Sequence, residues 1–205
     1  MTPIFSTENV RFKDIIAFPD IQVEPNIPAF VVGKNGSGKS TLFKMFNRTL
    51  SPASGRILYR GEDIASIPPL EIRKQVLLVA QQVFLFDDSI RGNFTKYYEV
   101  TGKAKPSDDE IEQYLSLSNA NFGLDHDART LSGGERQRVY LAIYASFKPD
   151  VLLLDEPTAA LDKESAVDVM AQIFNFCEEN KISCITISHD ANIVSLFARQ
   201  IVRLS

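Results

Sequence analysis

The sequence contains few cysteines, no long apolar run and no excess of positive charge. Its two cysteines, Cys177 and Cys184, lack the spacing of a metal site, which favours reduced thiols packed inside a cytosolic protein. The apolar runs are far shorter than the ~20 residues of a membrane-spanning helix. A net charge of −4 over 205 residues gives no general basic field for nucleic acid. The first residues show no basic segment followed by an apolar block, so we expect no signal peptide.

The sequence does contain a glycine-rich stretch between two apolar segments. Residues 29–32 form a short apolar run that predicts a buried strand, and Leu42, Phe43 and Phe46 have the spacing of one helical face. Strand, glycine-rich turn and helix form the context in which Gly-x-x-x-x-Gly-Lys-Ser binds phosphate. We therefore predict a phosphate-binding loop rather than an ordinary glycine turn. Its residues are Gly33, Lys34, Asn35, Gly36, Ser37, Gly38, Lys39, Ser40 and Thr41.

The residue types in this loop predict its ligand. Glycines let the backbone bend so that successive N–H groups point inward, and the start of the helix adds partial positive charge. Lys39 is predicted to reach the β- and γ-phosphates, and Ser40 is predicted to place its hydroxyl on Mg²⁺.

Two adjacent carboxylates, Asp155 and Glu156, follow the apolar run of residues 151–154. Open α/β sheets place ligand groups at the carboxyl ends of their strands, and carboxylates there are costly unless a cation or a proton donor uses them. We predict that Asp155 holds Mg²⁺ through water and that Glu156 polarises the attacking water as general base, rather than that they form a solvated pair. His189, which follows the run 182–187, is predicted to donate a hydrogen bond to a γ-phosphate.

Residues 131–138 read Leu-Ser-Gly-Gly-Glu-Arg-Gln-Arg and form the second distinctive stretch. Ser132 and Glu135 make a capping box, which predicts that a helix starts near Gly133. Gly133 and Gly134, at that helix start, would let a backbone N–H and a serine hydroxyl approach an anion closely. A capping box alone is weak evidence, but the intact stretch after a phosphate loop is highly specific.

The rest of the chain predicts strands before the phosphate loop and a helical insertion after it. Residues 4–31 show short strand-like runs, the first at residues 10–12, and an aromatic side chain there could stack on a nucleotide base. Residues 61–63 are predicted to form a turn. Phe12 is the first candidate and Phe18 the second, although either fits a core position as well. From residue 83 to about 148 the chain becomes mainly helical, with a capping box at residues 107–110. Its aromatic residues form either the core of this insertion or part of a groove for a partner helix.

With these motifs in order, the chain resembles an ATP-binding-cassette ATPase, the nucleotide-binding subunit of an ABC transporter. The resemblance covers nearly the whole chain. It implies that Gln81 senses Mg²⁺ and the attacking water, and that residues 160–162 form the D-loop, which ends in Asp162. The chain departs from the family pattern in a short segment before the phosphate loop and in Ala159, where the D-loop usually has serine.

The resemblance also implies the organisation of the fold. It implies a single ABC-type P-loop NTPase domain over residues 1–205, of class α/β, with a mostly parallel core sheet. The core would comprise residues 1–82, which include an N-terminal antiparallel β part, and residues 149–205. Residues 83–148 would form a helical subdomain that carries the signature stretch.

The resemblance implies ATP and Mg²⁺ as ligands and two kinds of protein partner. In this family the signature of one chain, here Ser132 to Glu135, completes the phosphate site of another, so a head-to-tail homodimer is expected on ATP binding. The helical subdomain is expected to dock the coupling helix of an integral membrane permease. That partner would make the chain a peripheral protein on the cytoplasmic face of the cell membrane. The compact length and the run Gly61-Glu62-Asp63-Ile64 are similar to small bacterial subunits of the iron-exporter type.

Three other functions compete with this one. A soluble, non-transport ABC ATPase such as an iron–sulfur assembly ATPase fits the same motifs, whereas repair and translation members carry coiled coils or a second cassette that this sequence lacks. A P-loop kinase gives no reason for the signature stretch. Intact Glu156 and His189 argue against a non-catalytic nucleotide-binding module.

Overall fold

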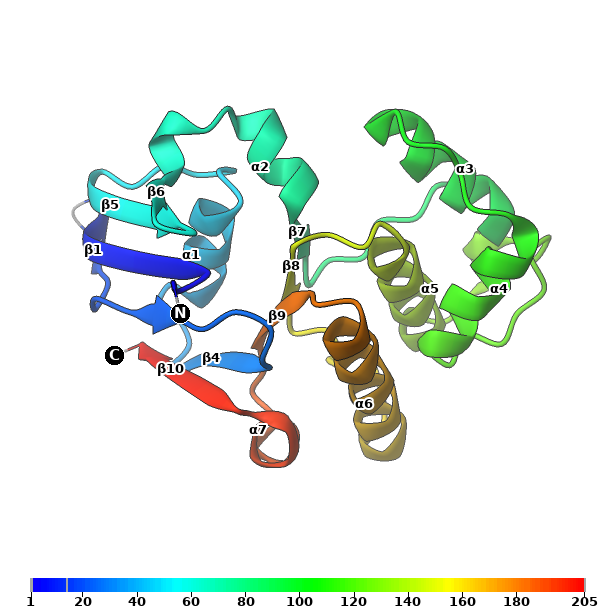
Figure 1. Ribbon diagram of the computed structural model, residues 1–205. Helices are drawn as coiled ribbons and strands as arrows, with labels where there is room; N and C mark the ends of the chain where they lie inside the picture. The colour runs from blue at the N-terminus through cyan, green and yellow to red at the C-terminus, as the bar shows by residue number, and fades with distance from the viewer. Residues whose placement is uncertain (1, 14, 205) are drawn as a thin grey trace.

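The computed structural model describes residues 2–13 and 15–204. In these residues a parallel sheet lies between an antiparallel sheet and a group of helices (Figure 1). The strands are β1 (Phe5–Phe12), β2 (Ile16–Ala17), β3 (Gln22–Val23), β4 (Ala29–Gly33), β5 (Ser54–Tyr59), β6 (Glu62–Asp63), β7 (Val76–Val79), β8 (Val151–Asp155), β9 (Ser183–Ile187) and β10 (Gln200–Leu204). The helices are α1 (Lys39–Phe46), η1 (Ile64–Ser66), α2 (Pro69–Gln75), α3 (Ile90–Thr101), α4 (Asp108–Leu117), η2 (Ala128–Thr130), α5 (Gly133–Ser146), α6 (Lys163–Glu179) and α7 (Ala191–Phe197). The predicted α/β class with a parallel core is confirmed.

The central sheet has the strand order β10-β4-β9-β8-β7, and its neighbouring strands run parallel. Alternate residues of β8 face opposite layers: Val151 and Leu153 pack in the cluster that contains α1, whereas Leu152 and Leu154 pack against helices of the other face. Burial on both faces explains why β8 is a continuous apolar run. Because parallel strands end at the same edge of a sheet, the segments that follow β4, β7, β8 and β9 are brought together there.

The antiparallel sheet forms around β1, which pairs with β2, β3 and β5. Helix α1 connects the two sheets, because Phe5 of β1 stacks on Phe46 of α1 with ring centroids 4.2 Å apart. Two local predictions differ from the structure. Strand β1 begins as early as Phe5, since its first residues pair with β5, and Glu62–Asp63, predicted as a turn, form strand β6.

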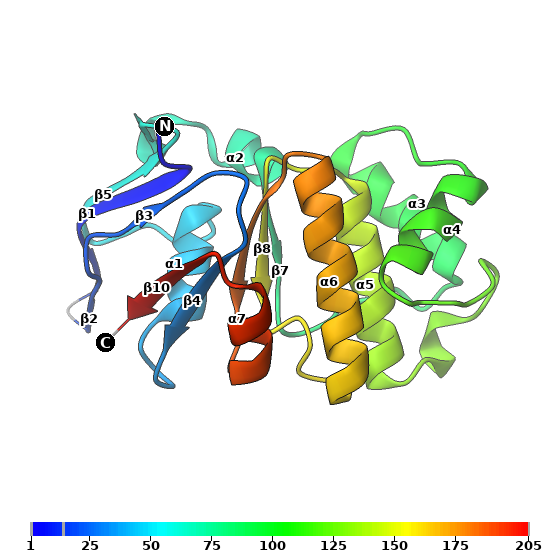
Figure 2. The ribbon, with the colours of Figure 1, turned by 60° about the horizontal axis from the view of Figure 1, so that its bottom comes forward.

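Helices α3, α4 and α5 lie in the range predicted as a helical insertion, on the side of the parallel sheet away from β1 (Figures 1 and 2). Of the aromatic residues there, Phe94 and Tyr98 are buried in a core shared with the sheet. Phe84 is 57% exposed and meets Phe86 edge-on. The cluster is therefore core for the most part, with one exposed ring at its rim. None of the helices in the described residues combines the length and apolar character needed to cross a membrane.

Candidate active site

The predicted phosphate loop connects the end of β4 to the start of α1. Gly36 and Gly38 have φ angles of 82° and 90°, in the left-handed region that glycine adopts without steric cost. Gly38 is also the N-cap of α1, so the loop leads directly into the positive end of the helix dipole. The local backbone therefore has the form of an anion-binding turn.

Two polar groups of this loop, the Lys39 side chain and the Ser37 hydroxyl, are buried, whereas Lys34 and Asn35 are exposed. The Lys39 side chain folds back over the loop, and its Nζ donates to the carbonyl oxygens of Gly33 and Lys34 at 3.0 and 3.1 Å. The Ser37 hydroxyl is buried without a hydrogen-bond partner among the described atoms. Buried polar groups normally have partners, so an unpaired hydroxyl in this loop indicates a polar ligand.

A cavity of about 510 Å³ opens over the loop. Its lining combines loop residues with residues that are distant in the sequence. The loop residues are Asn35, Gly36, Gly38, Lys39, Ser40 and Thr41, and the distant ones are Ile16, Gln81, Glu156 and His189. The three residues predicted as catalytic thus lie in one cavity with the phosphate loop, and the cavity has the size of an ordinary ligand pocket.

Glu156 stands between the two other predicted catalytic side chains. The Gln81 Nε2 donates to Glu156 Oε2 at 3.1 Å, and the His189 Nε2 lies 3.2 Å from Glu156 Oε1. These residues follow β7, β8 and β9, three adjacent strands of the parallel sheet. The Glu156 backbone has a φ of 51°, and its N–H donates to the Ile187 carbonyl at 3.0 Å. The carboxylate is therefore positioned from both sides and by its own backbone.

Asp155, the last residue of β8, fits the donor set of a hard cation. The carboxyl is buried, and its Oδ1 has no hydrogen-bond partner among the described atoms. Burial raises the pKa of Asp155 above its ordinary value, with a contribution from the Glu156 charge, while Ser40 and the nearby lysines oppose the shift. A carboxylate beside a serine hydroxyl suits Mg²⁺, which is held by few protein ligands and by phosphate oxygens. Within the described residues no cluster of three or more His, Cys, Asp or Glu side chains forms a separate metal site.

The signature stretch lies away from this cavity. Ser132 is the N-cap of α5, and its capping box with Glu135 is complete: the Ser132 N–H donates to Glu135 Oε2 at 2.7 Å, and the Glu135 N–H donates to the Ser132 hydroxyl at 3.4 Å. A Cβ on Gly134 would lie 2.8 Å from the Ala160 carbonyl oxygen, so the helix start packs tightly on the predicted D-loop. Asp162 ends that loop as the N-cap of α6. None of these residues is among the described residues that line the phosphate cavity.

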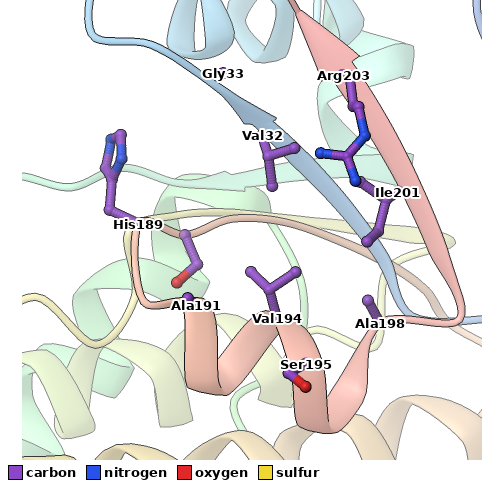
Figure 3. Close-up of a pocket in the computed structure, with 10 residues that line it drawn as sticks. Val32, Gly33, His189, Ala191, Val194, Ser195, Ala198, Ile201 and Arg203 are labelled. Atoms are coloured by element: carbon purple, nitrogen blue, oxygen red, sulfur yellow. The ribbon is translucent and has the colours of Figure 1, made fainter.

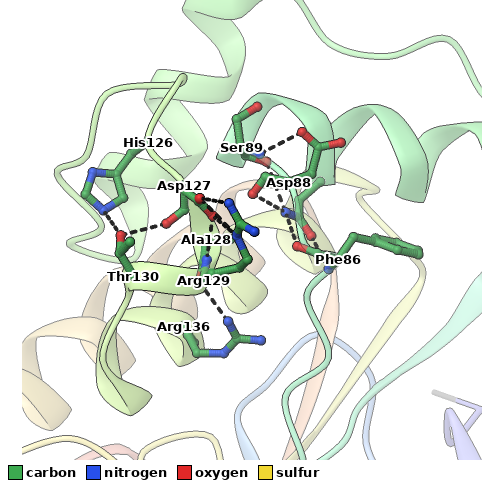
Figure 4. Close-up of polar contacts among 10 residues, drawn as sticks. Phe86, Asp88, Ser89, His126, Asp127, Ala128, Arg129, Thr130 and Arg136 are labelled. Atoms are coloured by element: carbon green, nitrogen blue, oxygen red, sulfur yellow. Dashed lines mark hydrogen bonds and ion pairs between the residues drawn. The ribbon is translucent and has the colours of Figure 1, made fainter.

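A polar network ties the segment before the signature to the segment that follows Gln81 (Figure 4). The Ala128 N–H donates to the Asp88 carbonyl at 2.9 Å, and the Arg136 guanidinium on α5 donates to the Ala128 carbonyl at 2.7 Å. The Arg129 guanidinium and backbone N–H lower the pKa of Asp127 to about 2. Hydrogen bonds thus link the signature helix to the segment that follows Gln81 within one chain.

The structure does not place Phe12 among the described residues that line the cavity; it places Ile16 there. The two face each other across the β1–β2 ladder, and the Lys13 Nζ lies 5.4 Å from the centroid of the Phe12 ring. Phe18 is buried beneath the loop, 3.0 Å from where a Cβ on Gly38 would lie. Sequence reasoning missed Ile16, because its place in the lining depends on the strand pairing and no local pattern marks it.

A second cavity, of about 500 Å³, lies between β4, β10 and α7 (Figure 3). Its walls include Val32, Val194 and Ile201 together with the Arg203 guanidinium, and it shares Gly33 and His189 with the phosphate loop region. Its lining contains neither Ser40 nor Asp155, so this cavity lies beside the phosphate site and adds no residue to the predicted metal-binding groups.

A phosphate loop, a carboxylate at the end of another strand of the same sheet and the parallel order of that sheet define a P-loop nucleoside triphosphatase. Comparison with protein families agrees, since the family model described as ABC transporter matches residues 19–159. The chain belongs to the ABC transporter family, as one of its ATP-binding ATPase domains.

Individual relatives support this membership. The chain is 34% identical over 189 residues to the protein STAR1 of rice (Oryza sativa subsp. japonica), with 92% of this chain and 54% of that protein covered. It is 33% identical over 160 residues to the probable iron export ATP-binding protein FetA of Escherichia coli K12, with 78% of this chain and 71% of that protein covered. A solved structure of a bacterial Atm1-family ABC exporter with ATP bound has a TM-score of 0.87 and 28% identity, covering 100% of this chain and 37% of the exporter chain. The chain spans about half or less of the first curated relatives that it matches.

Proposed function

We propose that the chain hydrolyses Mg-ATP and that the energy drives transport through a separate membrane subunit. The observation that carries the catalytic part is the Glu156 carboxylate, which meets Gln81 at 3.1 Å and His189 at 3.2 Å over the phosphate loop. A general base must lie within hydrogen-bond reach of the water that it activates, and this carboxylate faces the cavity where the γ-phosphate would lie.

Each residue has one task in this proposal. The loop N–H groups and the Lys39 ammonium would hold the β- and γ-phosphates, and the Ser40 hydroxyl with Asp155 and Gln81 would hold Mg²⁺. When bound, the metal neutralises the charge that develops on the phosphate oxygens. Glu156 orients the attacking water and accepts its proton on a carboxylate oxygen. His189 donates a hydrogen bond to the γ-phosphate.

A second copy of the chain is needed to complete the site. Ser132 and Gly134 sit at the positive end of α5, yet they are not among the described residues lining the cavity of their own chain. The helix start is therefore available to a γ-phosphate bound by another copy. We infer a head-to-tail dimer that closes on ATP and opens when hydrolysis removes the bridging phosphate.

We assign the binding site of the membrane partner to a groove between α2 and the ends of α3 and α5. This docking groove has a volume of about 300 Å³ and is lined by Leu70, Leu77, Val100 and Phe147, with Arg73, Lys74 and Lys103 beside them. Leu70 and Val100 are 70% and 84% exposed. Exposed apolar residues around a groove mark protein interaction sites. A coupling helix bound there would hold the chain at the cytoplasmic face of the membrane.

The relatives reported above give no support to the alternative of a soluble iron–sulfur assembly ATPase. The match to FetA, named as a probable iron export ATP-binding protein, supports the proposal that this chain serves a compact bacterial transporter of that type. Purification of the chain with its membrane subunit from solubilised membranes tests this, because a soluble scaffold protein in place of a membrane subunit would contradict it.

The catalytic proposal is tested by Glu156→Gln. We expect this variant to bind Mg-ATP, to hydrolyse it about 100-fold more slowly or worse, and to elute as a dimer in size-exclusion chromatography with light scattering. Glu164→Gln, the same change on the exposed start of α6, serves as the matched control and should hydrolyse ATP at the parent rate. Hydrolysis by Glu156→Gln at the parent rate would show that Glu156 is not the base.

A further inference from the structure

The phosphate loop contains an asparagine that is followed directly by a glycine. Asn35 is the only asparagine of the sequence with this neighbour, and all the others precede a residue that carries a side chain. The backbone nitrogen after an asparagine can attack the side-chain amide of that asparagine, and a side chain on the attacking residue hinders the approach. Glycine causes no such hindrance and reaches backbone conformations that other residues avoid. The sequence therefore places a nucleophile next to an electrophile inside the loop.

Both reacting groups are accessible in the structure. Asn35 and Gly36 are exposed, and both line the phosphate cavity. Among the described residues, the hydrogen bonds that the Ser37 N–H and the Lys39 ammonium make to loop carbonyls use neither the Asn35 amide nor the Gly36 N–H. A Cβ on Gly36 would meet nothing within 4 Å, so open space surrounds the attacking residue.

Asn9 provides a comparison within the same chain. It is exposed as well, and its φ of 50° lies in the left-handed region. The residue after it, Val10, is β-branched and is buried in the core cluster that contains α1. A stiff, buried side chain restrains the backbone nitrogen that would have to attack. Asn9 therefore has the exposure of Asn35 without its reactive neighbour.

We propose that Asn35 is a site of spontaneous deamidation and that its conversion lowers the affinity of the phosphate loop for nucleotide. The Gly36 nitrogen forms a bond to Asn35 Cγ and loses its proton, the Cγ–Nδ2 bond breaks, and ammonia leaves with that proton. A water molecule then opens the five-membered succinimide ring at either of its carbonyl carbons. One opening gives aspartate. The other gives isoaspartate, in which the main chain continues through the former side chain.

Either product opposes the binding of phosphate. Both replace a neutral amide by a carboxylate in the cavity over the loop, where it repels phosphate oxygens. Isoaspartate also adds a methylene group to the main chain of the loop, which displaces the N–H groups that would surround the anion. This loss of affinity rests on the proposed ATP site, whereas the conversion of Asn35 does not. A bound triphosphate would engage the loop N–H groups and so protect Asn35 from attack.

The test follows the folded full chain in mildly alkaline buffer, with and without a saturating nonhydrolysable analogue of Mg-ATP. Samples are digested under mildly acidic conditions, which do not support the reaction, and the peptides are analysed by liquid chromatography and mass spectrometry. We expect the Asn35 peptide to convert into aspartate and isoaspartate forms, while the Asn9 peptide keeps its amide. The analogue should slow the conversion by about tenfold or more, because only the unoccupied fraction of the chain reacts.

The converted chain carries an additional negative charge and is separated by anion-exchange chromatography. Its dissociation constant for the analogue, measured by isothermal titration calorimetry, should be about tenfold weaker or more than that of the fresh chain. Its circular dichroism spectrum should be unchanged, because the loop is exposed. Asn35→Ser has no side-chain amide, so this variant should keep its own initial dissociation constant through the same incubation.

Each part of the proposal has its own contrary result. An Asn35 peptide that keeps its amide as long as the Asn9 peptide does would overturn the modification site. Equal conversion rates with and without the analogue would overturn the protection. A converted chain that binds as tightly as the fresh chain, or an equal loss of affinity in Asn35→Ser, would overturn the effect on binding. If the fresh parent chain does not bind the analogue, the proposed ATP site fails, and the mass spectra still decide whether Asn35 converts.

Discussion

The backbone of Glu156 occupies the left-handed region, with a φ of 51°. A non-glycine residue there costs about 1–2 kcal/mol, and such costs are found where the surroundings fix the backbone. Here the surroundings are visible: the N–H donates to the Ile187 carbonyl, and the carboxylate meets Gln81 and His189. The unfavourable backbone conformation turns the side chain from the end of β8 toward the cavity.

The two glycines of the signature differ in how much space surrounds them. A Cβ on Gly134 would lie 2.8 Å from a backbone oxygen, that of Ala160, whereas a Cβ on Gly133 would meet nothing within 4 Å. We expect Gly134→Ala to lower the free energy of unfolding by about 1–3 kcal/mol, because backbone must shift, and Gly133→Ala to change it by less than about 0.5 kcal/mol. Urea unfolding of the two variants measures this, and equal losses would contradict the close packing of α5 on the D-loop.

The motif residues could be predicted from sequence because their chemistry is local. A lysine after a glycine turn, such as Lys39, and a carboxylate at a strand end, such as Glu156, can be recognised as candidate site residues from the few residues around them. Ile16 could not be found in this way. The sequence favoured Phe12 because an aromatic ring is the usual partner of a base, and the Phe12–Ile16 register places the other side chain of the pair in the lining.

At the scale of elements, two helices begin with the same kind of capping box. Ser107 with Glu110 caps α4 in the same way that Ser132 with Glu135 caps α5. The serine N–H and hydroxyl hydrogen bonds lower the pKa of both glutamates below their ordinary value. Since the two capping boxes have the same chemistry, comparing variants of the two serines separates a structural role of the serine from a functional one.

Ser132→Ala and Ser107→Ala should each lower the free energy of unfolding by about 1 kcal/mol, the usual cost of losing a serine cap. Only Ser132→Ala should reduce the ATP hydrolysis rate, by about tenfold or more, because its hydroxyl is proposed to meet the γ-phosphate of a second copy. Chemical denaturation and phosphate release measure the two effects. Equal hydrolysis rates in both variants would remove Ser132 from the composite site.

The elements that the sequence predicted well are those with strong internal signals. The capping boxes and the apolar runs of β8 and β9 are of this kind. Strand β6 was predicted as a turn, because Glu62–Asp63 is polar and its strand conformation comes only from pairing with Leu58 and Tyr59. The early start of β1 has the same cause, since β5 pairs with it across more than forty residues of chain.

At the scale of the whole molecule, the proposed catalytic cavity and the docking groove are lined by different residues. The parts between them are β7, which ends before Gln81 and contributes Leu77 to the groove, and α3, which contributes Val100. The network from Asp88 to Arg136 joins the same region to the signature helix. Strand β7, helix α3 and this network thus connect the docking groove to Gln81, the proposed catalytic glutamine, and to the signature helix.

Val100→Asp tests the groove. A charge there should abolish co-purification of the chain with its membrane subunit, because a desolvated carboxylate opposes burial against an apolar helix. Leu196→Asp is the matched control: Leu196 is 56% exposed on α7, outside the groove, and its substitution should leave co-purification intact. Loss of the partner in both variants, or in neither, would remove the groove from the proposed interface.

The lysine of the phosphate loop, Lys39, donates hydrogen bonds to two carbonyl oxygens of its own loop. An ammonium has three protons, so one is left to meet an incoming phosphate oxygen while the other two keep the side chain in place. These two hydrogen bonds restrict the rotation of the long Lys39 side chain, which reduces the conformational entropy that binding a phosphate would cost. The N–H groups of a guanidinium lie in one plane and lack the three-way arrangement of an ammonium. Arginine is therefore a poor substitute at this position despite its equal charge.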